Sequence, residues 1–299
     1  MRTNRWYKSG KTLLSEIAKS VPGPGSVPNA GPTPNSDSVL IWYMGQHGFT
    51  IGLGGKIFYI DVILNALRGK DGKDRRNYPP PFDPGAIQQV DYYICTHNHG
   101  DHLNLDTILP LAKANPETVF IVPKPWVSVL TKAGISKDRV LGACSGQNLQ
   151  AGNVQIIPVP AIHTRYIQDE GEKDKNGDLV ALGFVLKADG FSVYHPGDTW
   201  INPRLAGILK GLGPIDIAML PINGTDWDRT SYGCIGNVSA MDAVKLALAV
   251  PVDLVIPCHY DMMPDNTENP AYFVDCFYRY CPQKRFHICS LGERFVYCR

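Results

Sequence analysis

The sequence predicts an α/β fold of the α+β type, in which two sheets pack face to face and helices cover their outer sides. Three observations predict it. Apolar runs of strand length alternate with amphipathic segments of helix length from residue 39 to the C-terminus. The pattern occurs twice, each time as hairpins followed by helices, which two packed sheets with outer helices would satisfy. No internal repeat recurs at solenoid periods.

Residues 1–38 differ in composition from the rest of the chain. Residues 6–19 predict a short amphipathic helix, and a segment rich in Pro, Gly and Ser follows it. The prolines exclude a helix there, and the composition cannot build a core. We therefore expect an N-terminal helix and Pro/Gly-rich arm over residues 1–38, and one folded domain over residues 39–299.

The first half of the domain begins with strands joined by tight turns. Gly54-Gly55 is a two-residue hairpin signal, and Pro125 suits the first turn of a helix. The expected strands are 39–44, 49–53, 56–62, 90–95, 119–122 and 154–162, and the expected helices are 107–114 and 125–133.

The second half repeats the arrangement. Asp189-Gly190 marks another hairpin, and Ser239 can cap the helix that follows it. The expected strands are 180–186, 191–195, 216–220, 253–258 and two closing strands within 286–297, and the expected helices are 203–212, 239–250 and 270–281.

Composition excludes several classes of protein. The net charge of +1 argues against a nucleic-acid partner, which would require a basic surface. No apolar run approaches the roughly 18 residues that span a bilayer, so we expect no membrane association. Charged residues interrupt the apolar segment that a secretory signal would need, which predicts a cytoplasmic protein. The 8 cysteines form no CxxC pair and predict no cysteine-built zinc site.

The segment from Thr96 to His102 carries the strongest chemical signal. His97, His99, Asp101 and His102 lie directly after the strand expected at 90–95. Imidazole and carboxylate groups are ligands for divalent metals such as zinc and manganese. A short loop after a strand can aim them at one point, so the segment predicts a metal site. A solvated polar loop is the alternative.

Three further candidate ligands, His163, Asp198 and His259, lie at the ends of expected strands. Each alone is more often a structural histidine or a turn aspartate than a ligand. Together with the first loop, they supply the donors for two adjacent metals that keep coordination open for water. The predicted sets are His97, His99 and His163 for one metal, Asp101, His102 and His259 for the other, and Asp198 as the bridge.

Three neighbouring residues have two interpretations each. His195 either orients the Asp198 loop or is buried with a backbone partner. His47 could reach the rim of the site, but a role in its turn explains it equally well. Asp61, at the end of its strand, either holds the second nitrogen of a ligand imidazole or caps a turn.

The ligand pattern resembles the metallo-β-lactamase superfamily, whose signature is HxHxDH followed by a His, an Asp and a final His. The resemblance covers residues 39–299 and implies a four-layer αββα sandwich with metals at the sheet edges. Shorter motifs are similar to the branch typified by L-ascorbate-6-phosphate lactonase, namely residues 96–102, 194–198, 221–224, 234–237 and 259–262.

The branch resemblance implies a cytoplasmic, bacterial enzyme that opens a phosphorylated sugar lactone, uses manganese and forms a homo-oligomer. The chain departs from this branch in being shorter and in carrying His163. The additional histidine favours a complete two-metal site over the sugar-lactone substrate.

The predicted activity is metal-dependent hydrolysis of a small, anionic lactone or ester, of the phosphorylated sugar type. Two Mn²⁺ or Zn²⁺ ions per chain would hold a hydroxide, since a bound cation lowers the pKa of water to about 7. No GxSxG motif offers a protein nucleophile. Asp101 and Asp198 are the expected catalytic carboxylates, and Asp101 could pass its proton to the leaving group. Tyr166 and Tyr260 are alternative proton donors.

Substrate contacts are expected from two loops. Asn223, Thr225 and Arg229 follow a strand, and Arg165 lies two residues beyond His163. A guanidinium group suits phosphate and carboxylate, although a solvated surface position is the commoner outcome for such an arginine. The partner is therefore expected to be a small molecule.

Two other functions remain open. A phosphodiesterase on the same scaffold would act on a small or cyclic phosphodiester, and near-neutral charge argues against a large RNA substrate. A metal-bound sensor would hold cations without turning over either substrate. The absence of an export signal argues against a β-lactamase role.

Overall fold

The computed structural model describes residues 37–69, 71–164 and 170–299. Its strands form two seven-stranded sheets, in the orders β14-β1-β2-β3-β4-β5-β6 and β13-β12-β11-β10-β9-β8-β7. The first sheet consists of β1 (Ser38–Gly45), β2 (Gly48–Leu53), β3 (Lys56–Ile60), β4 (Tyr92–Ile94), β5 (Val119–Pro123), β6 (Val140–Ala143) and β14 (Arg294–Cys298).

The second sheet consists of β7 (Leu149–Ala151), β8 (Val154–Pro160), β9 (Leu182–Ala188), β10 (Phe191–His195), β11 (Ile215–Pro221), β12 (Val252–Cys258) and β13 (Arg285–Phe286). The α-helices are α2 (Leu105–Ala114), α3 (Val127–Lys132), α4 (Pro203–Gly211), α5 (Trp227–Ser231), α6 (Ala240–Ala249) and α7 (Pro270–Tyr280).

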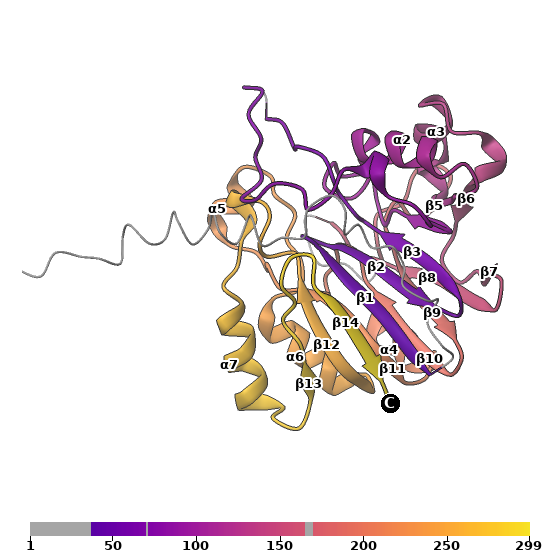
Figure 1. The fold of residues 1–299 in the computed structure, drawn as a ribbon. Helices are drawn as coiled ribbons and strands as arrows, with labels where there is room; N and C mark the ends of the chain where they lie inside the picture. Colours follow the sequence, from indigo (N-terminus) through magenta and orange to yellow (C-terminus); the bar gives the residue numbers. More distant parts are fainter. Residues whose placement is uncertain (1–36, 70, 165–169) are drawn as a thin grey trace, which may run out of the picture.

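Three hydrophobic clusters define four layers. The first cluster lies between the two sheets and joins residues such as Ile51 of β2 to Leu186 of β9. The second lies between the second sheet and α4, α6 and α7, and the third packs α2 and α3 against the first sheet. Figure 1 shows the helices on the outer sides of the paired sheets. The predicted αββα sandwich is therefore confirmed.

The carboxyl ends of several parallel strands in each sheet lie at the same edge of that sheet. In the first sheet β3, β4 and β5 run parallel, and the turn between β1 and β2 lies beside the end of β3, because Phe49 pairs with Ile60. In the second sheet β10, β11 and β12 run parallel, and β8 shares their direction because both β8 and β10 are antiparallel to β9. The carboxyl ends of these strands form the edge where ligands bind in such sheets.

Both hairpin signals and most element positions are confirmed. The turns at 54–55 and 189–190 join antiparallel strands, and the Ser239 side chain accepts a hydrogen bond from the backbone of Asp242. The strand expected at 56–62 ends at Ile60, because Asp61 adopts a positive φ of 50°. The two closing strands lie in different sheets, with β13 beside β12 and β14 beside β1.

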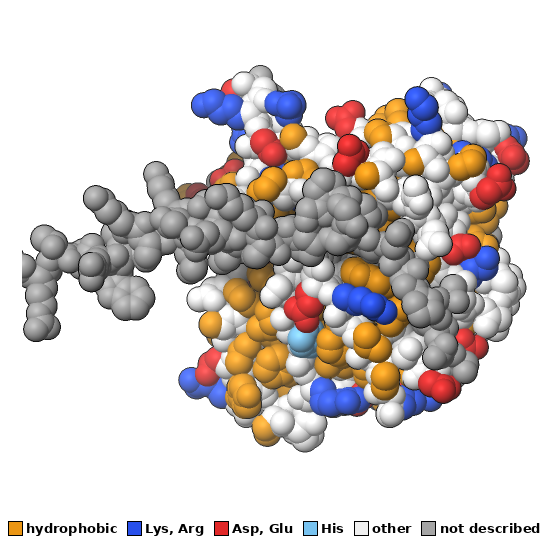
Figure 2. All heavy atoms as spheres, in the orientation of Figure 1, with side chains coloured by type: hydrophobic (Ala, Val, Ile, Leu, Met, Phe, Trp, Pro, Cys, Tyr) orange, Lys and Arg blue, Asp and Glu red, His pale blue; other side chains and the backbone are white. Residues whose placement is uncertain are grey.

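Surface properties agree with the composition. On the face that Figure 2 shows, basic and acidic side chains are interspersed around the edge, without a broad patch of either sign among the described residues. No helix in the described part of the chain combines the length and apolar character that crossing a bilayer requires. The expected N-terminal helix and nearly all of the arm, residues 1–36, lie outside the described residues.

Candidate metal centre

The loop after β4 is held in place by one buried carboxylate, that of Asp61. Its Oδ1 accepts a hydrogen bond from the backbone N–H of Thr96 at 2.8 Å, and its Oδ2 accepts one from the Thr96 hydroxyl at 2.6 Å. His102 Nδ1 lies 2.8 Å from the same Oδ2. A carboxylate on one imidazole nitrogen fixes the ring and directs the other nitrogen toward a metal. Asp61 therefore contacts the second nitrogen of the His102 imidazole, as one of its two interpretations expects, and the role of His102 as a ligand stays a prediction.

A glycine brings the Asp198 loop against this first loop. Gly197 has a positive φ of 63°, and a Cβ built on it would lie 2.7 Å from the Cβ of Thr96. Only glycine tolerates both the backbone conformation and the close contact. The consequence is that Asp198, which follows β10, lies directly beside the histidines that follow β4.

The first cluster of donors contains His97, His99, His163 and Asp198, whose ligand atoms all lie within 4.8 Å of one another. His163 Nε2 lies 3.1 Å from His99 Nδ1 and 3.9 Å from Asp198 Oδ2. The structure thus brings together the side chains of the first predicted metal set.

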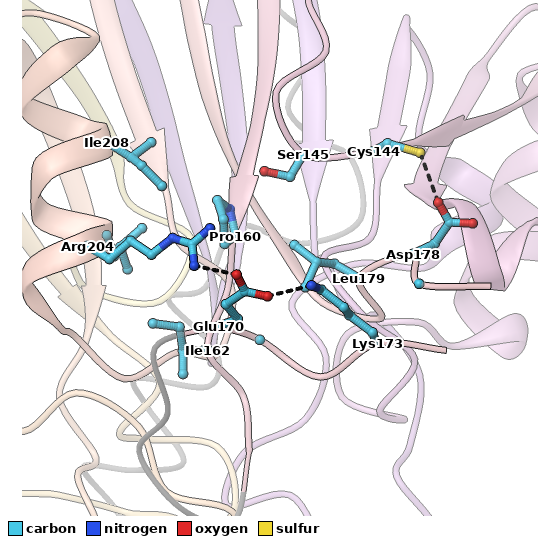
Figure 3. A pocket seen from close by; sticks show the side chains of 13 residues that line it. Cys144, Ser145, Pro160, Ile162, Glu170, Lys173, Asp178, Leu179, Arg204 and Ile208 are labelled. Carbon is cyan, nitrogen blue, oxygen red and sulfur yellow. Dashed lines mark hydrogen bonds and ion pairs between the residues drawn. The ribbon is translucent and has the colours of Figure 1, made fainter. Parts of the chain in front are cut away.

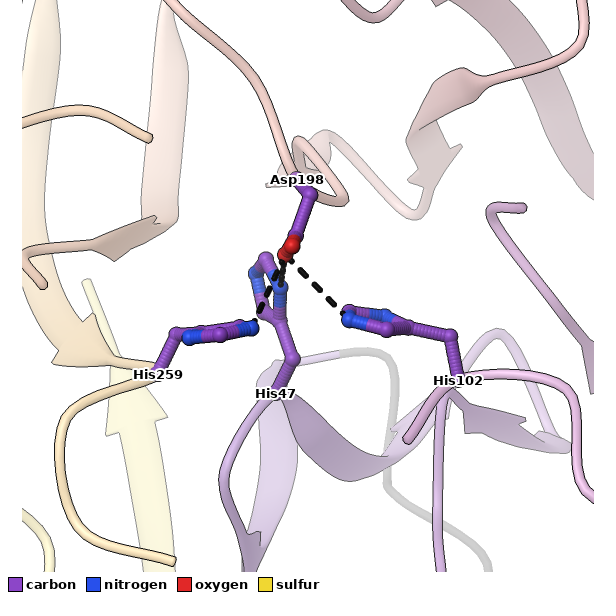
Figure 4. Close-up of side chains that lie close together, drawn as sticks. All are labelled: His47, His102, Asp198 and His259. Carbon is purple, nitrogen blue, oxygen red and sulfur yellow. Dashed lines mark hydrogen bonds and ion pairs between the residues drawn. The ribbon is translucent and has the colours of Figure 1, made fainter. Parts of the chain in front are cut away.

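The second cluster contains His47, His102, His259 and the same Asp198, again within 4.8 Å. Figure 4 shows the three rings around the carboxylate. Asp101 Oδ2 lies slightly farther out, 3.6 Å from His102 Nε2 and 3.6 Å from His259 Nε2. The second predicted set therefore also converges, and His47 joins it.

Asp198 connects the two clusters through different oxygens. Its Oδ1 faces the rings of the second cluster, at 3.2 Å from His259 Nε2, and its Oδ2 faces His163. A carboxylate in this position can bridge two cations, as expected from the sequence.

Burial and neighbouring charges prepare the donors for cations. Although burial opposes ionisation, His259 and His102 hold the pKa of the Asp198 carboxyl well below its usual range. Burial also opposes ionisation of Asp101, but His102 and His259 again lower its pKa. Burial lowers the pKa of His163 to about 4, so its ring is neutral at neutral pH and its lone pair is available.

Two of the buried ring nitrogens that lack a hydrogen-bond partner in the described part of the chain could coordinate a metal ion. His97 Nε2 and His102 Nε2 are buried and have no hydrogen-bond partner among the described residues. Burying a polar atom without a partner costs free energy. A cation that binds imidazole nitrogen, such as zinc, would supply a partner for both His97 Nε2 and His102 Nε2. The donor set of imidazoles and carboxylates is therefore suited to metal binding.

His195 supports the site without facing its centre. Its Nε2 donates to the backbone carbonyl of His47 at 2.8 Å, and its Nδ1 accepts a hydrogen bond from the backbone N–H of Gly197 at 3.3 Å. The two interpretations of His195 are both confirmed, since it is buried with a backbone partner and orients the Asp198 loop.

Gln46 is a residue of the site that the sequence did not reveal. It is buried, and its Nε2 donates to Asp101 Oδ2 at 3.0 Å and lies 3.2 Å from His259 Nε2. The only available signal was its place in the turn beside the end of β3, which requires the sheet register. Asp261 fixes this turn by accepting from the backbone N–H of Gln46 at 3.0 Å.

A cleft of about 560 Å³ opens beside the second cluster. This volume lies within the range of small-molecule sites. Asp101, which lies beside the second cluster, lines this cleft, and its side chain is 22% exposed. Other lining residues are Arg68, Arg75, Asp106, Cys234, Asp265 and Asn266.

Among the described substrate candidates, Asn223, Thr225 and Arg229 do not line this cleft. Asn223 is buried and donates to Asn266 Oδ1 at 2.9 Å, and Arg229 donates to the same oxygen at 2.9 Å. Thr225 is exposed, with its hydroxyl 3.2 Å from that of Thr230. Asn223 and Arg229 therefore position Asn266, and their direct contact with substrate stays a prediction.

The structure does not test the predicted roles of Arg165, Tyr166 and Tyr260. Arg165 and Tyr166 lie outside the described residues. Tyr260 packs in the hydrophobic cluster beneath α6 and α7, and its role as a proton donor stays a prediction.

A second hollow, of about 300 Å³, lies beside α4 (Figure 3). Its charged side chains are paired, because Glu170 pairs with both Lys173 and Arg204, and Asp178 pairs with Lys124. No member of the two histidine clusters lines this hollow.

Solved structures with this architecture include metal enzymes. A metallo hydrolase from Ignicoccus hospitalis superposes with a TM-score of 0.64 at 19% identity, covering 87% of this chain and 98% of its own. An isothiocyanate hydrolase from Delia radicum gut bacteria gives a TM-score of 0.67 at 16% identity, covering 87% and 99%. At these identities the likeness concerns the fold.

Sequence comparison identifies the family. The model of the β-lactamase superfamily domain matches residues 58–260. A UPF0173 metal-dependent hydrolase from Thermofilum pendens is 31% identical over 219 residues, which cover 69% of this chain and 83% of the relative. The chain, with its buried cluster of histidines and aspartates at the sheet edge, belongs to the UPF0173 metal-dependent hydrolases of the metallo-β-lactamase superfamily.

Proposed function

We propose that the protein hydrolyses a small, anionic lactone or ester with two divalent cations that share Asp198. His97, His99 and His163 hold one cation, and His102 and His259 hold the other. When bound, the cations supply a water of lowered pKa and polarise the carbonyl oxygen under attack. The observation that carries the proposal is the position of Asp101, a carboxylate that lies beside both the cluster and the cleft.

Asp101 is the proposed proton acceptor. Its carboxyl is ionised at neutral pH, because His102 and His259 lower its pKa despite burial. Gln46 Nε2 donates to its Oδ2 at 3.0 Å and fixes its orientation. A general base must be ionised, oriented and within reach of the substrate pose, and Asp101 meets the first two conditions.

Two arginines support an anionic substrate. Arg68 and Arg75 lie on the wall of the cleft that Asp101 lines. Their guanidinium groups match the planar, bidentate geometry of carboxylate and phosphate. A carbonyl substrate with one such group can place its ring or ester bond toward Asp101 while the arginines hold its anion.

The donor set favours zinc over manganese. Imidazoles outnumber carboxylates in both clusters, and imidazole nitrogen suits zinc, whereas manganese prefers oxygen ligands. The relation to the ascorbate-phosphate lactonase branch, the cytoplasmic location and the homo-oligomer remain predictions.

A substrate panel tests the proposed reaction. The purified chain is stripped with a chelator, reloaded with Zn²⁺ or Mn²⁺, and assayed against a phosphorylated sugar lactone, its neutral parent lactone and bis(p-nitrophenyl) phosphate. We expect the phosphorylated lactone to be the best substrate, and Asp101→Asn to lower kcat by about 100-fold or more. The control is Lys137→Gln. Lys137 is exposed and lies in the short 3-10 helix Lys137–Arg139, directly before β6.

The opposite preference would contradict the proposal. Turnover of the phosphodiester without the lactones would favour a phosphodiesterase. Tight binding of cations without turnover of any of the three would favour the sensor.

A further inference from the structure

His47 occupies a position in the second cluster that a ligand would occupy. It lies in the turn between β1 and β2, and its ring is buried. Its Nδ1 lies 3.2 Å from Asp198 Oδ1. Figure 4 shows the ring beside those of His102 and His259, directed at the same carboxylate.

The distances around Asp198 Oδ1 match a coordination shell. The nearest ring nitrogens of His47, His102 and His259 lie 3.2, 3.3 and 3.2 Å from this oxygen. With zinc–ligand bonds of about 2.0–2.1 Å, two donors of a tetrahedron lie about 3.3 Å apart. The three separations from Asp198 Oδ1 are therefore close to this edge length, and all four ligand atoms lie within 4.8 Å of one another.

Hydrogen bonding alone accounts poorly for this arrangement. A carboxylate oxygen offers about two lone-pair directions, and three ring nitrogens approach this one. His102 also faces Asp61 through Nδ1, so its Nε2 carries the lone pair when Nδ1 donates. A cation at the centre would satisfy all three nitrogens and the oxygen together.

Asp101 is less well placed for the same cation. Its Oδ2 lies 3.6 Å from the ring nitrogens of His102 and His259, and it already accepts a hydrogen bond from Gln46. Its side chain is partly exposed to the cleft, whereas His47 is fully buried. The geometry thus separates a buried ligand from a carboxylate that faces substrate.

The backbone holds His47 in this position. Its carbonyl accepts from His195 Nε2 at 2.8 Å, and the two rings stack with centroids 4.4 Å apart. The turn begins at Gly45, where φ is +91° and a Cβ would collide with the hydroxyl of Tyr78. The ring is therefore preorganised before any cation binds.

We propose that His47 is a ligand of the second cation, in the place that we expected Asp101 to fill. The inference rests on the proposed two-cation function. Each cation then has three imidazoles and one oxygen of Asp198, and Asp101 remains free in the cleft as a base.

Cobalt titration tests the assignment without an activity assay. Metal-free wild-type chain is titrated with Co²⁺, and bound cobalt is counted by elemental analysis and by its visible absorption. We expect two cobalt ions per chain in the wild type and in Asp101→Asn. His47→Ala should retain one tightly bound ion, and 50 mM imidazole should restore the second, because free imidazole can enter the space of the missing ring.

Two controls keep the result interpretable. His287→Ala removes the histidine of a separate group, with Cys289 and Glu293, and should still bind two ions. Far-UV circular dichroism of the metal-free variants must match the wild type. Where His47→Ala fails to fold, His47→Gln is used, which should also retain one ion, because it removes the ring nitrogen and keeps a polar side chain.

The outcomes separate this inference from the proposed function. Two ions in folded His47→Ala, or one ion in Asp101→Asn, would overturn the assignment of His47 while leaving a two-cation hydrolase intact. A wild-type chain that binds fewer than two ions would overturn both. Two ions with no turnover on the substrate panel would overturn the proposed reaction and leave His47 as a ligand.

Discussion

At the scale of the residue, the site depends on a few side chains whose roles differ although their types are alike. Asp61 orients an imidazole, Asp198 lies between two clusters, and Asp101 faces the cleft. The sequence predicted the convergence of the first loop with His163, because ligands at strand ends meet at one edge. It could not separate a turn histidine from a site histidine at His47, since this depends on strand register.

Protonation at the second cluster predicts a pH dependence for cation binding. Although burial opposes it, Asp198 and Asp101 raise the pKa of the metal-free His259 ring to about 9. A raised pKa means that the ring carries a proton at pH 7, and a cation must displace it. Affinity should therefore increase between pH 7 and 9, by at most about tenfold per pH unit for each proton displaced.

Calorimetry in two buffers of different ionisation enthalpy measures the protons released. The Asp106→Asn variant, changed on the wall of the cleft, should release the same number as the wild type. An affinity that is constant across this range would show that the ring is already neutral before the cation binds.

At the scale of the element, the sequence predicted what local chemistry determines. The glycine turns and the Ser239 cap were visible, because positive φ and an N-terminal hydrogen bond demand particular residues. The short strands β6 and β7 and the five-residue helix α5 were missed. Each is too short to establish a period.

The contact between the Asp198 loop and the loop after β4 can be tested at Gly197. In Gly197→Ala, the new Cβ lies 2.7 Å from the Cβ of Thr96 at a positive φ of 63°, so both loops must move. We expect a loss of about 1–3 kcal/mol in the free energy of unfolding, together with loss of tight cation binding.

Gly55→Ala is the matched control for this substitution. Gly55 has a similar φ of 71°, but nothing lies within 4 Å of its Cβ position. It should lose about 1 kcal/mol through the backbone alone and bind cations normally. Equal cation affinity in the two variants, measured by titration, would show that contact between the loops does not position Asp198.

At the scale of the whole molecule, the fold brings strand ends from both sheets to one edge. The two-half pattern predicted paired sheets with helices outside, and the three hydrophobic clusters have this arrangement. The sequence could not predict the order of the strands, because β13 and β14 are neighbours along the chain yet join different sheets. The site depends on this order, since its donors follow β1, β4, β8, β10 and β12.

Anomalous diffraction from crystals grown with Zn²⁺ tests the two-cation centre most directly. We expect two zinc peaks about 3.5–4 Å apart on either side of the Asp198 carboxylate, as in other two-metal sites. One should lie among His97, His99 and His163, and the other should lie beside His102. Peaks absent from this edge, or a single peak with both oxygens of Asp198 on one ion, would contradict the account.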